Sequence, residues 1–395
     1  MLIGVGSNGI IGFILFSLYG GALKVLSVFN NKGGVGKTTL TYHLGHALSE
    51  LGYRVLMIDA DPQCNLTIYS IKEDVIHEIW EREDRVIDEG FESEKKKMTP
   101  EEFATLNSST RSLHYLLKPT EEGTGDLDKL PPPYKVTPML DIIPGRLTLH
   151  LFEEKIASRW TDLYRGEPLA LRTITKIREL SESYSAAYSY DYVIVDTSPS
   201  LGALNKSVIS TVDGFFVPAL PDLFSLYGIK NIGRALSAWK SEFEIIYKLI
   251  SNDKRKHFPD RFVTFLGYTV YNAKKYTKDT NNDLNLAQAH YAYARKIPVT
   301  IRENIGVELR DHLTEELLES PIGGKAIMLT HNTFPSMAQY YHLPMWKVPD
   351  LLQLPEVVEG QHVNTIRGAS SKYRATGDSY KIFCQDLIHR VSLLG

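Results

Sequence analysis

Residues 23–61 read LKVLSVFNNKGGVGKTTLTYHLGHALSELGYRVLMIDAD. The apolar run 23–29 predicts a buried strand, and the Gly-rich loop behind it leads into a stretch whose leucines recur on one helical face. A second apolar run, 54–58, ends at an aspartate. The segment therefore predicts one strand–helix–strand unit of a parallel sheet, with its loops at the carboxyl edge, where such sheets bind ligands.

The same alternation of short apolar runs and helix-length segments continues along the chain. It predicts an α/β fold with a doubly wound, mostly parallel sheet flanked by helices, as in P-loop NTPases. The further strands are expected at 139–143, 192–195, 215–217 and 262–270.

The Gly-rich loop has the residues that a phosphate site needs. Gly33, Gly34 and Gly36 allow backbone N–H groups to converge on phosphate oxygens at the positive end of the following helix. In the standard motif G-x-x-x-x-G-K-S/T the lysine, here Lys37, neutralises phosphates and the hydroxyl, here Thr38, ligates Mg²⁺. The expected nucleotide-binding loop comprises Asn31, Lys32, Gly33, Gly34, Val35, Gly36, Lys37, Thr38 and Thr39.

The loop departs from that standard, because Asn31 stands where the first glycine belongs and Lys32 follows it. The resulting pattern, K-G-G-x-G-K-T-T, resembles the deviant Walker A motif of the ParA, Soj and MinD family of P-loop ATPases. The resemblance covers residues 24–67 tightly and 137–272 loosely. It implies ATP and Mg²⁺ as cofactors and an ATP-dependent homodimer, in which Lys32 reaches the phosphates bound by the partner subunit.

Two further segments resemble motifs of the same family. Asp59-Ala60-Asp61-Pro62-Gln63 is similar to the family's D-x-D-P-Q, which implies that Asp61 positions the attacking water and Asp59 supports the loop. Phosphoryl transfer depends mainly on such positioning and on charge stabilisation. By this resemblance the expected catalytic residues are Lys32, Lys37 and Asp61.

The apolar run 192–195 ends at Asp196 and continues Thr-Ser-Pro, which resembles the family's Walker B strand with T-x-P. Asp196 is therefore expected to hold Mg²⁺ together with Thr38, through a water, because that ion keeps much of its hydration shell. Pro199 is a supporting residue of the same loop. Asn272, after the last expected strand, occupies the place of the family's adenine-contacting asparagine.

Composition limits the classes of partner. The chain has 395 residues, a formal net charge of -3, and only two cysteines, Cys64 and Cys384, which form no metal-binding pattern. These numbers argue against a generally polyanion-binding protein, so any DNA contact must come from a local basic patch. We expect a cytoplasmic protein, with association with the nucleoid as a further expectation.

Three regions are expected along the chain. Residues 1–22 form an apolar N-terminal extension of unknown role, for which a packed extension or an upstream start is favoured over a signal peptide or membrane span. Residues 23–300 form the ATPase domain, with a charged insertion at about 69–106. Residues 301–395 form a C-terminal helical extension that packs on this domain.

The family resemblance implies an ATPase that hydrolyses ATP to cycle on and off a scaffold, in DNA partition or cargo positioning, with an adaptor or activator protein. Non-specific DNA is the expected scaffold, since a few cations per subunit suffice for phosphate contacts. A MinD-like membrane role for the stretch 380–394, or a phage-defence or plasmid ATPase with a dedicated partner, stays open. Candidate DNA contacts are Arg367, Lys372 and Arg374, with a second basic run at Lys254, Arg255, Lys256, His257 and Arg261.

Overall fold

The computed structural model describes residues 22–127, 129–256, 258–271, 273, 282–325, 333–353 and 363–394. Its centre is one seven-stranded sheet in the order β3-β4-β2-β5-β1-β6-β7. The strands are β1 (Lys24–Val28), β2 (Val55–Ala60), β3 (Tyr134–Thr137), β4 (Leu140–Ile143), β5 (Tyr192–Thr197), β6 (Gly214–Ala219) and β7 (Thr264–Val270).

All neighbouring strands are parallel except β3, which pairs antiparallel with β4 at the edge. β1 lies between β5 and β6, so the loop that follows it leaves from the middle of the sheet. Because the side chains of β2 and β5 are buried on both faces, these strands read as continuous apolar runs. The predicted doubly wound, mostly parallel sheet flanked by helices is confirmed.

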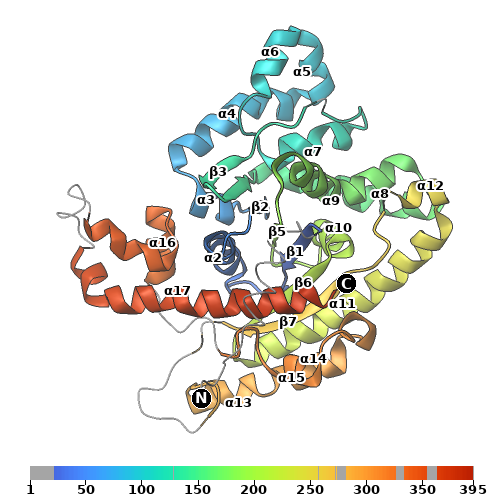
Figure 1. Ribbon diagram of the computed structural model, residues 1–395. Coiled ribbons are helices and arrows are strands. Elements are labelled where there is room, and N and C mark those ends of the chain that lie inside the picture. The colour runs from blue at the N-terminus through green and yellow to red at the C-terminus, as the bar shows by residue number, and fades with distance from the viewer. Residues whose placement is uncertain are drawn as a thin grey trace, which may run out of the picture.

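Helices cover both faces of the sheet (Figure 1). One hydrophobic cluster packs β-strand side chains against α7 (Leu113–Glu122), α8 (His150–Arg159), α9 (Pro168–Tyr188), α10 (Ala203–Thr211), α11 (Leu223–Leu249) and α14 (Ile297–Asn304). The cluster on the other face includes residues of α2 (Lys37–Glu50), α3 (Asn65–Ser70), α16 (Phe334–Tyr341), η4 (Met345–Gln353) and α17 (Val363–Ser392).

The charged stretch that follows α3 folds into helices. They are α4 (Glu73–Glu89), α5 (Phe91–Lys97) and α6 (Pro100–Leu106). Ile76, Ile79 and Val86 of α4 are buried, and so is the carboxylate of Glu83. The remaining short helices are η1 (Leu147–Leu149), η2 (Trp160–Arg165), α12 (Asn252–Arg255), α13 (Gln288–Ala294), η3 (Val307–Leu309) and α15 (Glu315–Glu319).

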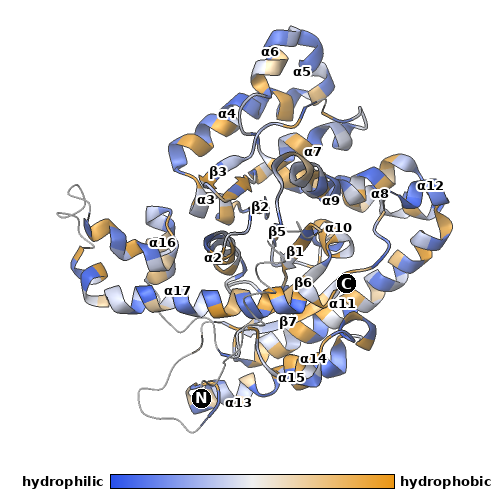
Figure 2. Cartoon of the chain, in the orientation of Figure 1, coloured by the Kyte–Doolittle hydropathy of each residue, from blue (hydrophilic) through white to orange (hydrophobic). Residues whose placement is uncertain are grey.

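The last helix, α17, packs against α2 and β7. Figure 2 shows hydrophobic and hydrophilic residues alternating along it. Phe383, Leu387 and Val391, which also fit the membrane-helix hypothesis for 380–394, are buried in the core, while Ile382 is half-exposed. Within the described ranges, no helix is both long and apolar enough to cross a membrane. Residues 1–21 of the predicted N-terminal extension lie outside the described residues.

Candidate functional site

The loop between β1 and α2 has the backbone of a phosphate cradle. Gly34 and Gly36 adopt φ of 72° and 81°, a left-handed region that glycine enters without steric cost. A Cβ on Gly36 would lie 2.0 Å from the Tyr271 ring, so this position has no room for a side chain. In the described part of the chain no side chain caps the start of α2. Its first N–H groups are therefore free to bind an anion.

Lys37, the first residue of α2, is buried, and its Nζ donates a hydrogen bond to the carbonyl of Lys32 at 3.3 Å. Burial lowers the pKa of Lys37, whereas Asp196 and Asp61 raise it. The ammonium is thus held inside the loop, beside the aspartates that end β2 and β5.

Thr38 and Asp196 meet although 158 residues separate them. The Thr38 hydroxyl donates to one carboxylate oxygen of Asp196 at 2.7 Å, and the Thr41 hydroxyl donates to the other at 3.3 Å. The contact arises because Val28, at the end of β1, is the register partner of Asp196. A hydroxyl and a carboxylate are hard oxygen donors of the kind that Mg²⁺ prefers.

Asp59 and Asp61 lie at the end of β2, where Asp59 is the register partner of Asp196. Asp59 accepts hydrogen bonds from the Thr67 amide at 2.8 Å and the Thr67 hydroxyl at 2.6 Å, and from the Asp61 amide at 3.2 Å. Asp61 accepts one from the Gln63 amide at 2.9 Å. Asp59 is therefore committed to holding the loop, while Asp61 keeps carboxylate capacity for other contacts.

The electrostatics of this edge suit a bound cation. Burial, together with the neighbouring Asp59, raises the pKa of Asp196 to about 8. Burial also raises the pKa of Asp59 to about 7, against the hydrogen bonds from Thr67. A bound divalent cation would favour the charged form of Asp196, so Thr38 and Asp196 fit a Mg²⁺ site. No group of three or more His, Cys, Asp or Glu able to hold a metal exists among the described residues.

Lys32 lies outside this cluster, at the mouth of the loop. Its Nζ donates to the Asp222 carboxylate at 2.6 and 2.9 Å and to the Ser225 hydroxyl at 3.4 Å. Asp222 and Ser225 begin α11, where Asp222 accepts from the Ser225 amide at 2.8 Å as the N-cap. Sequence reasoning missed this pair, because the N-cap spacing Asp222 to Ser225 indicates where α11 starts but not that Lys32 contacts it.

Exposed apolar and aromatic side chains lie next to the Lys32 pair, on the first turns of α11. Phe224 is 71% exposed with its ring 5.8 Å from the Lys32 Nζ, and Tyr227 is 57% exposed. Leu223 on the same helix turn is also exposed. Exposed aromatic residues grouped beside a charged site are typical of protein interaction surfaces.

The other predicted site residues fall around this edge. Asn31 has a buried side-chain oxygen with no hydrogen-bond partner among the described residues. The Thr39 hydroxyl lies 3.2 Å from the Tyr69 hydroxyl. Pro199 is exposed in the loop after β5, which Asn205 pins through the Ser198 and Ser200 carbonyls, each at 2.8 Å. Asn272 lies outside the described residues.

The two basic runs differ in how their cations are engaged. Arg367 and Lys372 are exposed on α17, whereas Arg374 on the same helix pairs with Asp350 at 2.9 Å. In the second run, Lys254 donates to the Gly166 carbonyl at 2.5 Å. Arg255 there donates to two carbonyls of the last turn of α11. The second run is therefore largely used for internal contacts, and its His257 lies outside the described residues.

Comparison with known proteins identifies the family of this chain. A family model described as AAA domain matches residues 23–247, more than half of the chain. The chromosome partitioning protein ParA of Caulobacter vibrioides is 26% identical over 261 residues, 60% of this chain and 78% of that protein. The sporulation initiation inhibitor Soj of Bacillus subtilis is 25% identical over 209 residues, 53% of this chain. That match spans 63% of Soj, less than two thirds of its length.

Among solved structures, a complex of Cyanothece McdA with ATP superimposes with a TM-score of 0.53 at 17% identity. The superposition covers 94% of this chain and 98% of that one, and at this identity it shows the shared fold alone. The family match and the ParA and Soj relatives confirm the predicted resemblance. The chain belongs to the AAA domain family of this match and, within it, to the ParA-like P-loop ATPases.

Proposed function

We propose that this protein is an ATPase that binds ATP with Mg²⁺, closes into a homodimer around the nucleotide, and hydrolyses ATP to cycle on and off a scaffold. The observation that carries the proposal is the meeting of Lys37, Thr38, Asp61 and Asp196 at one sheet edge, with Lys32 outside it on an exposed apolar rim. The first four suit nucleotide chemistry within one chain. The fifth suits contact with a second copy.

In this proposal the uncapped start of α2, the glycine turn and Lys37 bind the phosphates. Thr38 and Asp196 would hold Mg²⁺, which when bound supplies positive charge to the phosphate oxygens. Asp61 orients the attacking water, because its side chain is less engaged than that of Asp59 and lies close enough to Lys37 to raise the lysine's pKa. Asp59 keeps the Asp61 loop in place through its bonds to Thr67 and to the Asp61 amide.

Lys32 has two alternative partners in this scheme. In the single chain it binds Asp222, and in the dimer it binds the phosphates of the partner subunit. The Lys32–Asp222 pair is partly exposed, with side-chain exposures of 21% and 39%. A pair of this kind contributes only about 0–1 kcal/mol to stability, so little free energy is lost when Lys32 leaves Asp222 for the phosphates of the partner subunit. Burial of Phe224 and Tyr227 in the closed dimer would add apolar contact.

We expect Lys32→Ala to bind ATP with an affinity within about threefold of wild type and to form no ATP-dependent dimer. The reason is that Lys32 contacts the phosphates of the partner subunit rather than those of its own chain, and the Asp222 pair that is also lost contributes little. A fluorescent ATP analogue measures the affinity, and light scattering behind a sizing column measures the mass.

The matched variant is Asp222→Asn, which removes the charge that holds Lys32 within its own chain but keeps the cap of α11. It should dimerise with ATP at least as well as wild type. If Lys32→Ala and Asp222→Asn weaken the dimer equally, the lysine serves the α11 contact and its role across the subunits is wrong.

For the scaffold we propose non-specific DNA, with an adaptor or activator protein as a further partner. Arg367 and Lys372 are exposed on α17, whereas the likewise exposed Arg374 pairs with Asp350, and a dimer presents two copies of each. DNA binding would place the protein in the cytoplasm at the nucleoid. The MinD-like membrane role has less support, since Phe383, Leu387 and Val391 are committed to the core.

We expect the ATP-bound protein to bind duplex DNA with an affinity that falls as salt rises. Arg367→Ala with Lys372→Ala should reduce the salt slope by up to about 4 per dimer, because each lost phosphate contact removes about one unit. A gel shift at several salt concentrations measures this, with Lys381→Ala, further along α17, as the control. Flotation with anionic vesicles but no shift of DNA would favour the membrane alternative.

A further inference from the structure

A loop on the far side of Asp59 connects the site to the helices that follow α3. It comprises Pro144, Gly145 and Arg146, directly after β4. The Gly145 amide donates to the Thr67 hydroxyl at 2.7 Å, and that hydroxyl donates to Asp59 at 2.6 Å. A Cβ on Gly145 would lie 3.0 Å from the Asp59 carboxyl carbon, so the loop backbone rests directly against this aspartate. The position of the loop therefore fixes the hydroxyl that holds Asp59.

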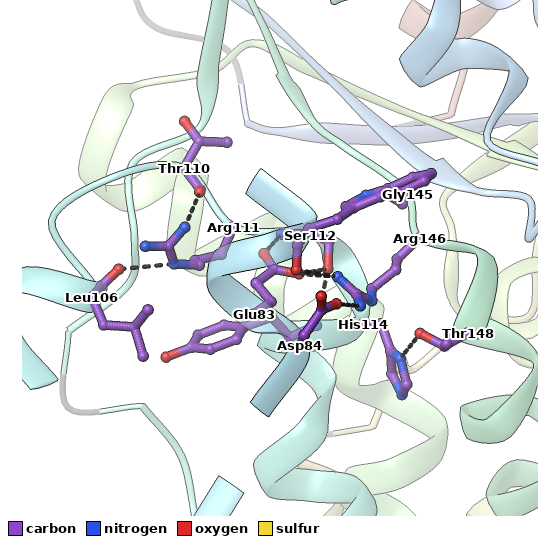
Figure 3. A network of polar contacts seen from close by, with 12 residues as sticks. Glu83, Asp84, Leu106, Thr110, Arg111, Ser112, His114, Gly145, Arg146 and Thr148 are labelled. Carbon is purple, nitrogen blue, oxygen red and sulfur yellow. Dashed lines mark hydrogen bonds and ion pairs between the residues drawn. The ribbon is translucent and has the colours of Figure 1, made fainter. Parts of the chain in front are cut away.

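Arg146 fastens this loop to α4 (Figure 3). Its guanidinium donates to the Trp80 carbonyl at 2.9 Å and to Asp84 at 2.5 Å, and Glu83 lies at 3.4 Å. In return the Trp80 indole donates to the Gly145 carbonyl at 3.1 Å. Arg146 is only 7% exposed. A planar guanidinium serves several acceptors at once, which an ammonium cannot reproduce.

Glu83 extends the connection from α4 to α7. Its carboxylate, which is fully buried, accepts from the Ser112 amide at 2.5 Å and from the Ser112 hydroxyl at 2.6 Å. The next residue, Leu113, donates its amide to the Pro144 carbonyl at 2.7 Å. The loop 144–146 is thus held by α4 on one side and by the start of α7 on the other. These bonds reach the site through Asp59 and do not involve the phosphate loop.

We propose that Arg146 is a positioning residue for hydrolysis, which acts through Gly145 and the Thr67 hydroxyl to hold Asp59 and the Asp61 loop. The inference rests on the proposed ATPase function. Its physical basis is that a displacement of about 1 Å at a reacting group can lower a rate by about 100-fold. It also gives the helices α4 and α7 a defined route to the site, since both are bonded to the same loop.

A double-mutant cycle tests the route. Arg146→Gln and Thr67→Val should each lower kcat at least about tenfold with ATP affinity changed less than about threefold, while Thr67→Ser restores most of the rate. The kcat of the double variant should lie no more than about threefold below that of the slower single variant, because both substitutions interrupt the same series of contacts. The control is Arg82→Gln, which removes an exposed α4 arginine paired with Glu78 and should stay within about twofold of wild type.

The proposal would be overturned if the double variant lost kcat by the product of the two single losses, or if Arg146→Gln left kcat unchanged. Asp84→Asn replaces Arg146→Gln in the cycle if the latter does not fold, because it weakens only the half-exposed end of the contact. Hydrogen exchange at the Thr67 amide gives a readout independent of turnover, and it should rise in Arg146→Gln but not in Arg82→Gln. If the wild-type protein did not hydrolyse ATP, the proposed function would be refuted. Hydrogen exchange at the Thr67 amide would still show whether Arg146 holds Asp59 in place.

Discussion

Lys37→Ala is expected to abolish ATP binding at concentrations where the wild type is saturated. Lys37 is a buried cation at the start of α2, beside the glycine turn. Two unit charges about 4 Å apart attract by about 4 kcal/mol at an effective dielectric constant of about 20, and each ~1.4 kcal/mol is a factor of ten in affinity. The expected loss is therefore about 1,000-fold. Titration with a fluorescent ATP analogue measures it directly.

The control for this variant is Lys72→Ala, which removes an exposed lysine just before α4 and should leave the affinity unchanged. Circular dichroism checks that both variants are folded. Binding of ATP by folded Lys37→Ala within tenfold of wild type would show that the glycine loop is not the nucleotide site.

Asp61→Ala is expected to lose hydrolysis by about 100- to 10,000-fold while ATP affinity is retained, the range for removal of a group that positions or activates a reactant. The carboxylate accepts only the Gln63 amide among the hydrogen bonds of the described residues. Its removal therefore disturbs one turn and leaves the phosphate loop intact. Phosphate release under saturating ATP measures the rate.

Asp61→Asn separates the two roles of this side chain, because an amide oxygen still accepts from Gln63 but carries no negative charge. We expect it to be as slow as Asp61→Ala. If Asp61→Asn hydrolysed ATP at the wild-type rate, the aspartate would serve the turn and the proposed role in catalysis would be wrong.

The parts of the fold that were predictable from the sequence are those specified locally. The unit β1–α2–β2 combines apolar strands with a glycine turn in one continuous segment, so its type and order could be read directly. β3 was missed because it is short, lies at the sheet edge and follows Pro131, Pro132 and Pro133, which indicate a loop. Its pairing with β4 depends on a register that no local pattern reveals.

The site divides in the same way. The aspartate at the end of β5 was predictable from its apolar strand, and the parallel register then brings it to Thr38. The partners of Lys32 and Arg146 were not predictable, since Asp222 is 190 residues from Lys32, and Glu83 is 63 residues from Arg146. The burial of Glu83 within the charged insertion was not predictable either, because Ser112 and Arg146, which contact its carboxylate, lie 29 and 63 residues further along the chain.

Sedimentation of Asp61→Ala tests most directly whether ATP closes a dimer, because this variant should hold the nucleotide without turnover. With ATP and Mg²⁺ it should sediment at twice the chain mass of 44.6 kDa, and with ADP at the mass of one chain. Adding Lys32→Ala to the same chain should return the ATP-bound species to one chain. A single-chain mass for Asp61→Ala at saturating ATP would contradict the dimer.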